Sequence, residues 1–276
     1  MIIERIKLLT FSPTRTSLKV GNAIVAGYGA EQYSLIDYSR MEHSAYVATS
    51  DILTVITVPV YGGHVAPLAL KRMENIKGNN SPAVIAVVYG NRDYEEALSQ
   101  LSDFVTQRGF RVIAAGTFIG EHSYSCETFP IASGRPDAED IVYAKNFGKS
   151  VRHKIDAVNG KEIPVINVHN IARPHQSLFS KIGFIVNVLR MRRSKKPMPS
   201  TPDVDKTLCN HCGACANICP TGAITIGNEL ETSKDLCIRC CACVKTCPQK
   251  ARSFSSPFAP ILAKYCQKQK QNRTII

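Results

Sequence analysis

The chain has 276 residues, of which 44% are hydrophobic, so it can bury a sizeable core, and this composition excludes a globally disordered protein. Its 34 Lys and Arg residues outnumber 22 Asp and Glu residues and give a formal net charge of +12, which favours an acidic protein, a nucleic acid or an anionic membrane as partner. The N-terminal sequence MIIERIKLLTF does not resemble a signal peptide, and no run of about 18 apolar residues predicts a transmembrane helix, so we expect a cytoplasmic protein.

Residues 1–158 alternate between strand patterns and helix patterns. The run ILTVITVPVYGG (52–63) is almost continuous in β-branched and apolar residues, which is typical of a strand buried on both faces. Gly109 ends one amphipathic helix pattern, and Pro136 with the acids that follow it opens the last one. Five strands that alternate with helices predict an α/β domain with an open parallel sheet. The predicted strands are residues 3–11, 33–38, 52–63, 82–91 and 110–118, and the predicted helices are residues 17–28, 65–75, 93–109 and 136–158.

The alternation stops where the first domain ends, at residue 158. Residues 159–204 are expected to form a linker or surface strap, with a moderately apolar segment followed by a basic, Pro-rich end. Residues 205–255 form a cysteine-rich module. Residues 256–276 are expected to be a polar, basic C-terminal tail with little capacity to contribute to a core.

Nine of the 11 cysteines fall inside the cysteine-rich module. They form the pattern CxxCxxCxxxCP twice, which is typical of bacterial ferredoxins with two [4Fe–4S] clusters, where the fourth cysteine of each run reaches the other cluster. A zinc module is the alternative, but zinc sites use four ligands in two hooks, and this does not explain the repeated pattern. We therefore predict one cluster on Cys209, Cys212, Cys215 and Cys247, and a second cluster on Cys237, Cys240, Cys243 and Cys219.

Three cysteines fit no ligand position. We interpret Cys126, Cys241 and Cys266 as ordinary residues, with a redox or ligand-exchange role for Cys241 as the alternative. Each cluster with its four thiolates carries a charge of about −2, so the loaded protein stays basic, at about +8. The basic run RMRRSKK (190–196) is interpreted as a solvated surface; docking of an acidic redox partner is the alternative, and nucleic-acid binding is less favoured.

Three loops follow the first, third and fourth predicted strands, whose carboxyl ends line the ligand crevice of an open α/β sheet. They read SPTRTS (12–17), PVYGGHVA (59–66) and VYGNRDYEEA (88–97). With these loops, residues 1 to about 155 resemble the flavodoxin-like fold, joined here to a ferredoxin-like module, and such flavodoxin–ferredoxin fusions are typical of anaerobic microbes. The resemblance implies a five-stranded parallel sheet of order 2-1-3-4-5, a small α+β ferredoxin-like iron–sulfur domain, and FMN as a second cofactor.

The resemblance also implies roles for the loop residues. The FMN phosphate should bind to the first loop, where Arg15 replaces the family's glycine and offers a guanidinium that can pair with phosphate. The flavin ring should stack on Tyr61, with Tyr94 over its other face. The phosphate hydroxyls would come from Ser12, Thr14, Thr16 and Ser17, and the other expected FMN contacts are Pro59, Val60, Gly62, Gly63, Tyr89, Gly90, Asn91 and Arg92.

Three further residues are candidates for catalysis over the flavin. His122 and Ser123 belong to a loop after the fifth predicted strand, on the same edge of the sheet, and His64 belongs to the second FMN loop. The alternative is that these residues are structural, because no Ser–His–Asp or two-carboxylate arrangement surrounds them. No GxGxxG motif is present, so direct use of NAD(P)H is not supported.

Together these features predict a protein that moves electrons between two [4Fe–4S] clusters and FMN in anaerobic redox metabolism. Its partner would be a redox protein, such as a ferredoxin or a reductase, docking on a basic patch, with a small molecule as a further acceptor. One alternative is a flavin-dependent reductase with its own organic substrate near Tyr61, His64 and His122. Another is a redox-sensing regulator, but no helix-turn-helix pattern supports nucleic-acid binding.

Overall fold

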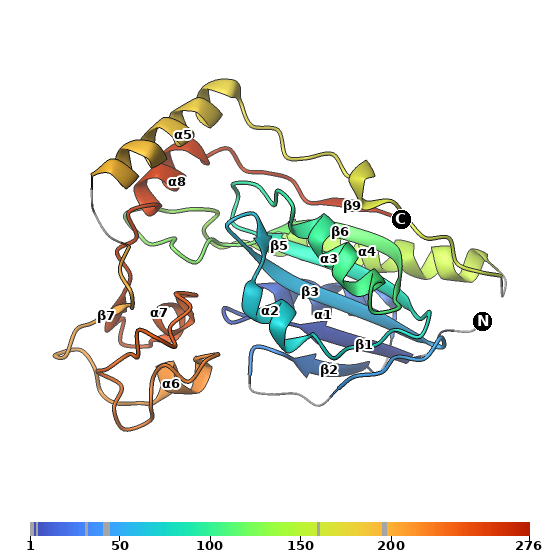
Figure 1. The fold of residues 1–276 in the computed structure, drawn as a ribbon, viewed down its shortest axis with the longest axis horizontal. Coiled ribbons are helices and arrows are strands. Elements are labelled where there is room, and N and C mark those ends of the chain that lie inside the picture. Colours follow the sequence, from blue (N-terminus) through green and yellow to red (C-terminus); the bar gives the residue numbers. More distant parts are fainter. Residues whose placement is uncertain (1–2, 4, 31–32, 41–44, 159–160, 195–197) are drawn as a thin grey trace.

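A parallel sheet forms the centre of the N-terminal domain (Figure 1). Its strands lie in the order β2-β1-β3-β5-β6, and all four neighbouring pairs are parallel. A two-residue strand, β4 (His64–Val65), pairs antiparallel with the end of β3 and lies off this path, so the parallel order is the predicted 2-1-3-4-5. The strands are β1 (Arg5–Thr10), β2 (Tyr33–Asp37), β3 (Ile52–Tyr61), β5 (Pro82–Tyr89) and β6 (Arg111–Ile119). The computed structural model describes residues 3, 5–30, 33–40, 45–158, 161–194 and 198–276.

Helices cover both faces of this sheet, and a separate hydrophobic core lies under each face. All eight residues of β5 are buried, as expected of a central strand that packs on both sides. One core is formed with α1 (Thr16–Tyr28) and α4 (Ala138–Ala157), and the other with α2 (Pro67–Arg72) and α3 (Ala97–Thr106). The predicted elements therefore form, with ends that shift by a few residues.

Two glycines let α1 and α4 approach backbone to backbone. A Cβ at Gly27 would lie 1.9 Å from the Lys145 carbonyl oxygen, and a Cβ at Gly148 would lie 2.0 Å from the Ile24 carbonyl oxygen. Both distances are far below a van der Waals contact, so any side chain there would push the helices apart. The close contact fixes α1, whose first turn faces the ligand end of the sheet.

The cysteine-rich module is small, and each of its two cysteine runs contains one short helix. It contains two five-residue helices, α6 (Ala214–Ile218) and α7 (Ala242–Thr246), and a two-stranded sheet of β7 (Asp203–Val204) and β8 (Arg252–Ser253). Polar contacts tie it to the first domain: Lys245 pairs with Glu121 and donates to the Ser125 carbonyl (2.7 Å), Lys250 pairs with Glu127 (3.0 Å), and Arg72 donates to the Pro220 carbonyl.

The C-terminal segment packs on the first domain, which corrects the expectation of a tail with little core capacity. It forms α8 (Ala259–Tyr265) and β9 (Arg273–Ile275), and β9 extends the sheet by pairing antiparallel with β6. Leu262 and Cys266 are buried in a small core of their own. The physical reason is that β6 would otherwise be an open edge, and a strand from the same chain satisfies its backbone groups.

The connecting segment also has structure of its own. It runs over the first domain through a short 3-10 helix, η1 (Val168–Asn170), and then forms α5 (Leu178–Arg193), which lies on α8 at the outer edge of the molecule (Figure 1). Part of the predicted basic run, Lys195 and Lys196, lies outside the described residues. Among the helices that the structure describes, none is long and apolar enough to cross a membrane.

Candidate functional site

A cavity of about 500 Å³ opens at the carboxyl ends of β1, β3, β5 and β6, with the cysteine-rich module on its other side. This is the size range of small-molecule and cofactor sites, roughly 300–1,000 Å³. The first domain lines it with Ser12, Pro13, Thr14, Thr16, Ser17, Pro59, Val60, Tyr61, Gly62, Val88, Tyr89, Gly90 and Gly120 to Tyr124. The rest of the chain adds Met198, Ile238, Arg239 and Phe258.

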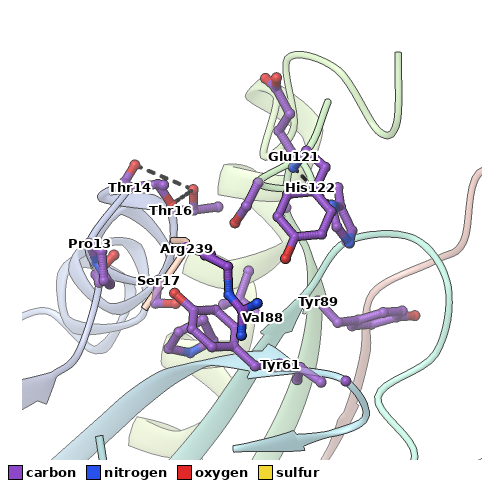
Figure 2. A pocket seen from close by; sticks show the side chains of 18 of the residues that line it. Pro13, Thr14, Thr16, Ser17, Tyr61, Val88, Tyr89, Glu121, His122 and Arg239 are labelled. Atoms are coloured by element: carbon purple, nitrogen blue, oxygen red, sulfur yellow. Dashed lines mark hydrogen bonds between the residues drawn. The ribbon is translucent and has the colours of Figure 1, made fainter. Parts of the chain in front are cut away.

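The hydroxyl loop forms one end of this cavity, at the N-terminus of α1. The Thr14 and Thr16 hydroxyls lie 3.2 Å apart (Figure 2), and the Ser12 hydroxyl accepts a hydrogen bond from the Leu18 amide (3.0 Å). A helix of 13 residues begins at Thr16, so free amides and the positive end of the helix dipole face the same place. The loop therefore has the chemistry of an anion site.

Arg15 adopts the left-handed backbone conformation that glycine usually provides at this position of the loop. Its backbone lies in the left-handed region (φ 62°), where glycine is unstrained and another residue costs about 1–2 kcal/mol. Its amide donates to the Ser12 carbonyl (2.9 Å). The side chain is exposed and lies outside the described cavity lining. A phosphate-binding role for its guanidinium stays a prediction.

The second and third loops line the cavity only in part. Pro59, Val60, Tyr61 and Gly62 line it. From the third loop, Val88, Tyr89 and Gly90 do so, but Figure 2 shows the Tyr89 ring turned away from the cavity.

Other predicted contacts are engaged elsewhere among the described residues. Asn91 donates to two carbonyls of the C-terminal segment, Arg92 pairs with Glu95, and Tyr94 is buried edge-on against Tyr89. Gly63 and His64 also lie outside the described lining. Their predicted FMN contacts, and the catalytic role proposed for His64, stay predictions.

His122 and Ser123 line the cavity together with Tyr124. The His122 ring packs on Gly90, where a Cβ would come within 2.5 Å of it, so this position needs glycine. The His122 Nδ1 accepts a hydrogen bond from the Tyr124 amide (3.0 Å). Burial, helped by the nearby cations Arg92 and Lys245, lowers the pKa of His122 to about 4. The ring is therefore neutral at neutral pH and carries its proton on Nε2.

Sequence reasoning missed the residues that the cysteine-rich module adds to the cavity. Arg239 and Ile238 lie between Cys237 and Cys240, inside one of the predicted cluster-binding runs. In Figure 2 the Arg239 side chain reaches into the space between the hydroxyl loop and His122. It is the cation among the described lining residues. No local pattern points to this role, because it arises only when the two domains dock.

Two small cavities in the module collect the predicted cluster ligands. One is lined by Cys209, Cys212, Cys215 and Cys247, and the other by Cys219, Cys237, Cys240 and Cys243. Each cavity thus combines three cysteines of one run with the fourth cysteine of the other. Among the described residues, no group of three or more Cys, His, Asp or Glu side chains is placed to hold a single metal ion; the four thiols instead surround a space.

The two cysteine cavities differ in their exposure. Cys212 is exposed, whereas Cys240 and Cys243 are buried. Burial raises the pKa of the Cys240 thiol to about 12 and that of the Cys243 thiol to about 11. Cys241, which also lines the inner cavity, is buried, and its thiol contacts the Arg239 carbonyl at 3.7 Å. The first cavity is therefore the outer one and the second is the inner one.

The inner cysteine cavity shares a wall with the large cavity. Ile238 lines both. Burial raises the pKa of Tyr61, and the neighbouring thiols of Cys240 and Cys241 raise it further. Burial likewise raises the pKa of Tyr124 to about 12, again with Cys241 nearby. A single layer of side chains therefore separates the inner cysteine cavity from the large cavity.

Comparisons with known proteins find different relatives for the two parts of the chain. Residues 202–225 and 230–253 match the family model of the 4Fe-4S binding domain. A stretch of 22 residues is 68% identical to a probable ferredoxin of Thermoplasma acidophilum and covers 8% of this chain and 31% of that protein. The chain thus matches less than a third of the length of this relative. Each of the two cysteine runs therefore lies inside one match to the 4Fe-4S binding domain.

Solved structures with a similar first domain are distant in sequence. They include a flavodoxin from the domain Archaea (9% identity, 55% of this chain and 99% of that chain, TM-score 0.37). Others are a flavone reductase (10% identity, 58% and 66%, TM-score 0.41) and the rubredoxin oxygen:oxidoreductase of Desulfovibrio gigas (12% identity, 58% and 38%, TM-score 0.37). The strand order of the sheet, rather than these likenesses, identifies the flavodoxin-like fold.

Proposed function

We propose that this protein transfers electrons between FMN, held in the large cavity, and two [4Fe–4S] clusters, held in the two cysteine cavities. The wall shared by the inner cysteine cavity and the large cavity, at Ile238, is the observation that carries this proposal. Bound FMN exchanges one or two electrons and each cluster exchanges one. A cluster beside the flavin cavity is therefore placed to act with it.

The large cavity fits FMN at both of its ends. The phosphate group would lie against the amides at the start of α1 and the hydroxyls of Thr14 and Thr16. The ring would lie toward Tyr61, whose phenol stays protonated because burial raises its pKa. Gly62 (φ 62°) lets the backbone pass close to the ring edge without a Cβ in the way.

Two side chains are placed to tune the flavin. Arg239 brings a positive charge to the cavity, which favours the added negative charge of a reduced ring. The neutral His122 offers an N–H donor but no charge, because its pKa is about 4. Hydrogen bonding and charge are thus supplied by different domains.

The outer cavity is the proposed entry point for electrons. Its Cys212 is exposed, while the inner cavity contains the buried Cys240 and Cys243 and adjoins the flavin cavity at Ile238. A redox protein such as a ferredoxin or a reductase would meet the outer cluster first. The ion pair between Lys245 and Glu121 and the hydrogen bond from Arg72 to Pro220 hold the module against the first domain, which favours transfer through a fixed contact.

The composition of the anaerobically purified protein tests the proposal. We expect an absorbance spectrum with flavin and iron–sulfur features, one extractable FMN, and about eight iron and eight sulfide per chain. Absence of flavin, riboflavin in place of FMN, or about four iron per chain would contradict it.

A second candidate is a flavin-dependent reductase with its own small organic substrate. A more open groove of about 750 Å³ adjoins the flavin cavity and shares Ser123 and Tyr124 with it. A substrate there would meet Ser123, one of the catalytic candidates, and would lie next to the flavin cavity that His122 lines. Steady turnover of an organic acceptor by the chemically reduced protein, lost in Ser123→Ala and His122→Gln, would favour this candidate over a pure carrier.

A further inference from the structure

One face of helix α5 packs on α8 and is partly buried there. Its Ser177 cap accepts a hydrogen bond from the Ser180 amide (3.2 Å). Asn187 donates to the Tyr265 hydroxyl of α8 (2.9 Å), and a Cβ at Gly183 would meet the Tyr265 ring at 2.4 Å. These contacts hold α5 on α8 and fix which face of the helix points outward.

The outer face of α5 is apolar and uncovered. Six large hydrophobic side chains stand there at spacings of three, four and seven residues, so they form one stripe along the helix. Phe179 alone is 89% exposed. Exposed apolar patches of this kind mark interaction sites. The stripe consists of Leu178, Phe179, Ile182, Ile185, Val186 and Leu189.

Cations flank this stripe and continue past its C-terminal end, and the segment that carries it has no acidic residue. Lys181, Arg190, Arg192 and Arg193 of α5 are all exposed. The sequence has no Asp or Glu between Glu162 and Asp203. A surface that is apolar along its centre and basic along its sides has the chemistry of a helix that lies in the interface of an anionic membrane. The apolar side chains enter the acyl boundary, and the long basic side chains reach the headgroups.

We propose that α5 docks this protein on an anionic lipid surface, with the helix axis in the plane of the membrane. Its 16 residues span about 24 Å, and the stripe runs from its first residue to Leu189, so most of its length would lie on the lipid. A second copy of the chain fits the face less well, because docking stripe to stripe would bring four cations against four. The proposal does not depend on the identity of the cofactors.

Vesicle binding of the complete, cofactor-loaded protein tests the proposal. We expect co-sedimentation with phosphatidylcholine vesicles containing 30% phosphatidylglycerol, weak binding to pure phosphatidylcholine, and release at 0.5 M NaCl. Each cation near an anionic surface contributes about fivefold to the partition coefficient. The double variant Arg190→Gln/Arg193→Gln should therefore bind roughly 30-fold more weakly, and Phe179→Ser/Ile182→Ser tenfold or more.

Matched controls separate docking from a general surface effect. Lys145→Gln/Lys149→Gln removes two exposed cations from α4, and Val142→Ser removes an exposed apolar side chain there; neither should change vesicle binding. The chain has no Trp, so Phe179→Trp gives a unique probe. Its emission should shift to the blue on anionic vesicles and be quenched by brominated lipid.

Three results would overturn the proposal. The first is equal binding to neutral and anionic vesicles. The second is vesicle binding that the α5 variants leave unchanged while flavin and iron contents confirm that they fold. The third is a dimer in gel filtration that Ile182→Ser converts to a monomer, which would assign the face to a second copy of the chain.

Discussion

The sequence and the structure assign different roles to Asn91, and replacing this residue distinguishes between the two roles. The sequence places it at the flavin ring, whereas in the structure its side chain binds the C-terminal segment. Its Nδ2 donates to the Cys266 carbonyl (2.5 Å) and the Lys268 carbonyl (3.3 Å), and its Oδ1 accepts from the Lys270 amide (2.8 Å). Asn91 is 1% exposed. We propose the variant Asn91→Gly, because φ is 60° there and alanine would add backbone strain.

The expected cost follows from the three lost hydrogen bonds. The groups of Lys268 and Lys270 lie near solvent and can bind water, so each bond lost there costs about 0.5–1 kcal/mol. Cys266 is buried, and its unpaired carbonyl costs about 1–3 kcal/mol. The sum, about 2–5 kcal/mol, should raise the population of detached β9 roughly 30- to 4,000-fold, since each 1.4 kcal/mol is a factor of ten.

In the same variant, hydrogen exchange measures the loss of contact with the C-terminal segment, and flavin titration measures the loss of a flavin contact. We expect the β9 amides to lose protection by this factor while FMN affinity changes less than threefold. The control Asn146→Ala removes an exposed asparagine from α4 and should change neither. Unchanged β9 protection together with a tenfold or greater loss of FMN affinity would refute the clamp and restore Asn91 as a flavin contact.

Three further predictions concern the site itself. Arg239→Gln should lower the two-electron potential of the flavin by about 20–40 mV in a redox titration, because one cation at this range is worth about 1–2 kcal/mol at an effective dielectric constant near 20–40. In Cys212→Ala/Cys247→Ala both changes fall in the outer site, so about four iron should remain per chain, whereas Cys212→Ala/Cys219→Ala should lose both clusters. The pKa of His122 is about 4 in the folded protein and near 6.5 when unfolded. As the pH falls from 6.5 toward 4, the unfolded chain binds a proton that the folded protein does not bind, so the free energy of unfolding declines. His122→Gln should abolish about 2 kcal/mol of this decline between pH 7.5 and pH 5 in urea unfolding.

Each of these three predictions has a result that would contradict it. Arg239→Lys keeps the charge and should keep most of the potential; an unchanged potential in Arg239→Gln would remove its electrostatic role. Equal iron loss in the two cysteine double variants would overturn the exchange of fourth ligands between the runs. An identical pH dependence in His122→Gln would show that the ring is not held neutral by burial.

The features that the sequence predicted correctly depend on the spacing of residues within short segments. The thiol pattern from Cys209 to Cys247 specifies its cavities because three ligands of each site come from seven consecutive residues. The alternation of buried strands with helices specifies the parallel sheet because both periodicities are properties of single segments. The hydroxyl loop at 12–17 was predicted for the same reason, since a strand, a turn and a helix start meet within a few residues.

The contacts that the sequence could not supply join residues far apart in the chain. Nothing near Asn91 shows that its partners lie some 175 residues later, and nothing in CIRC shows that Arg239 faces a cavity of the other domain. Likewise, the apolar residues of α5 look like core residues until packing on α8 leaves their face exposed. The sequence by itself therefore determined the two domain types and the grouping of the cysteines around two cavities, because local spacing encodes them. Only the tertiary structure decided how the domains close one cavity, because that depends on which surfaces remain after each domain has packed.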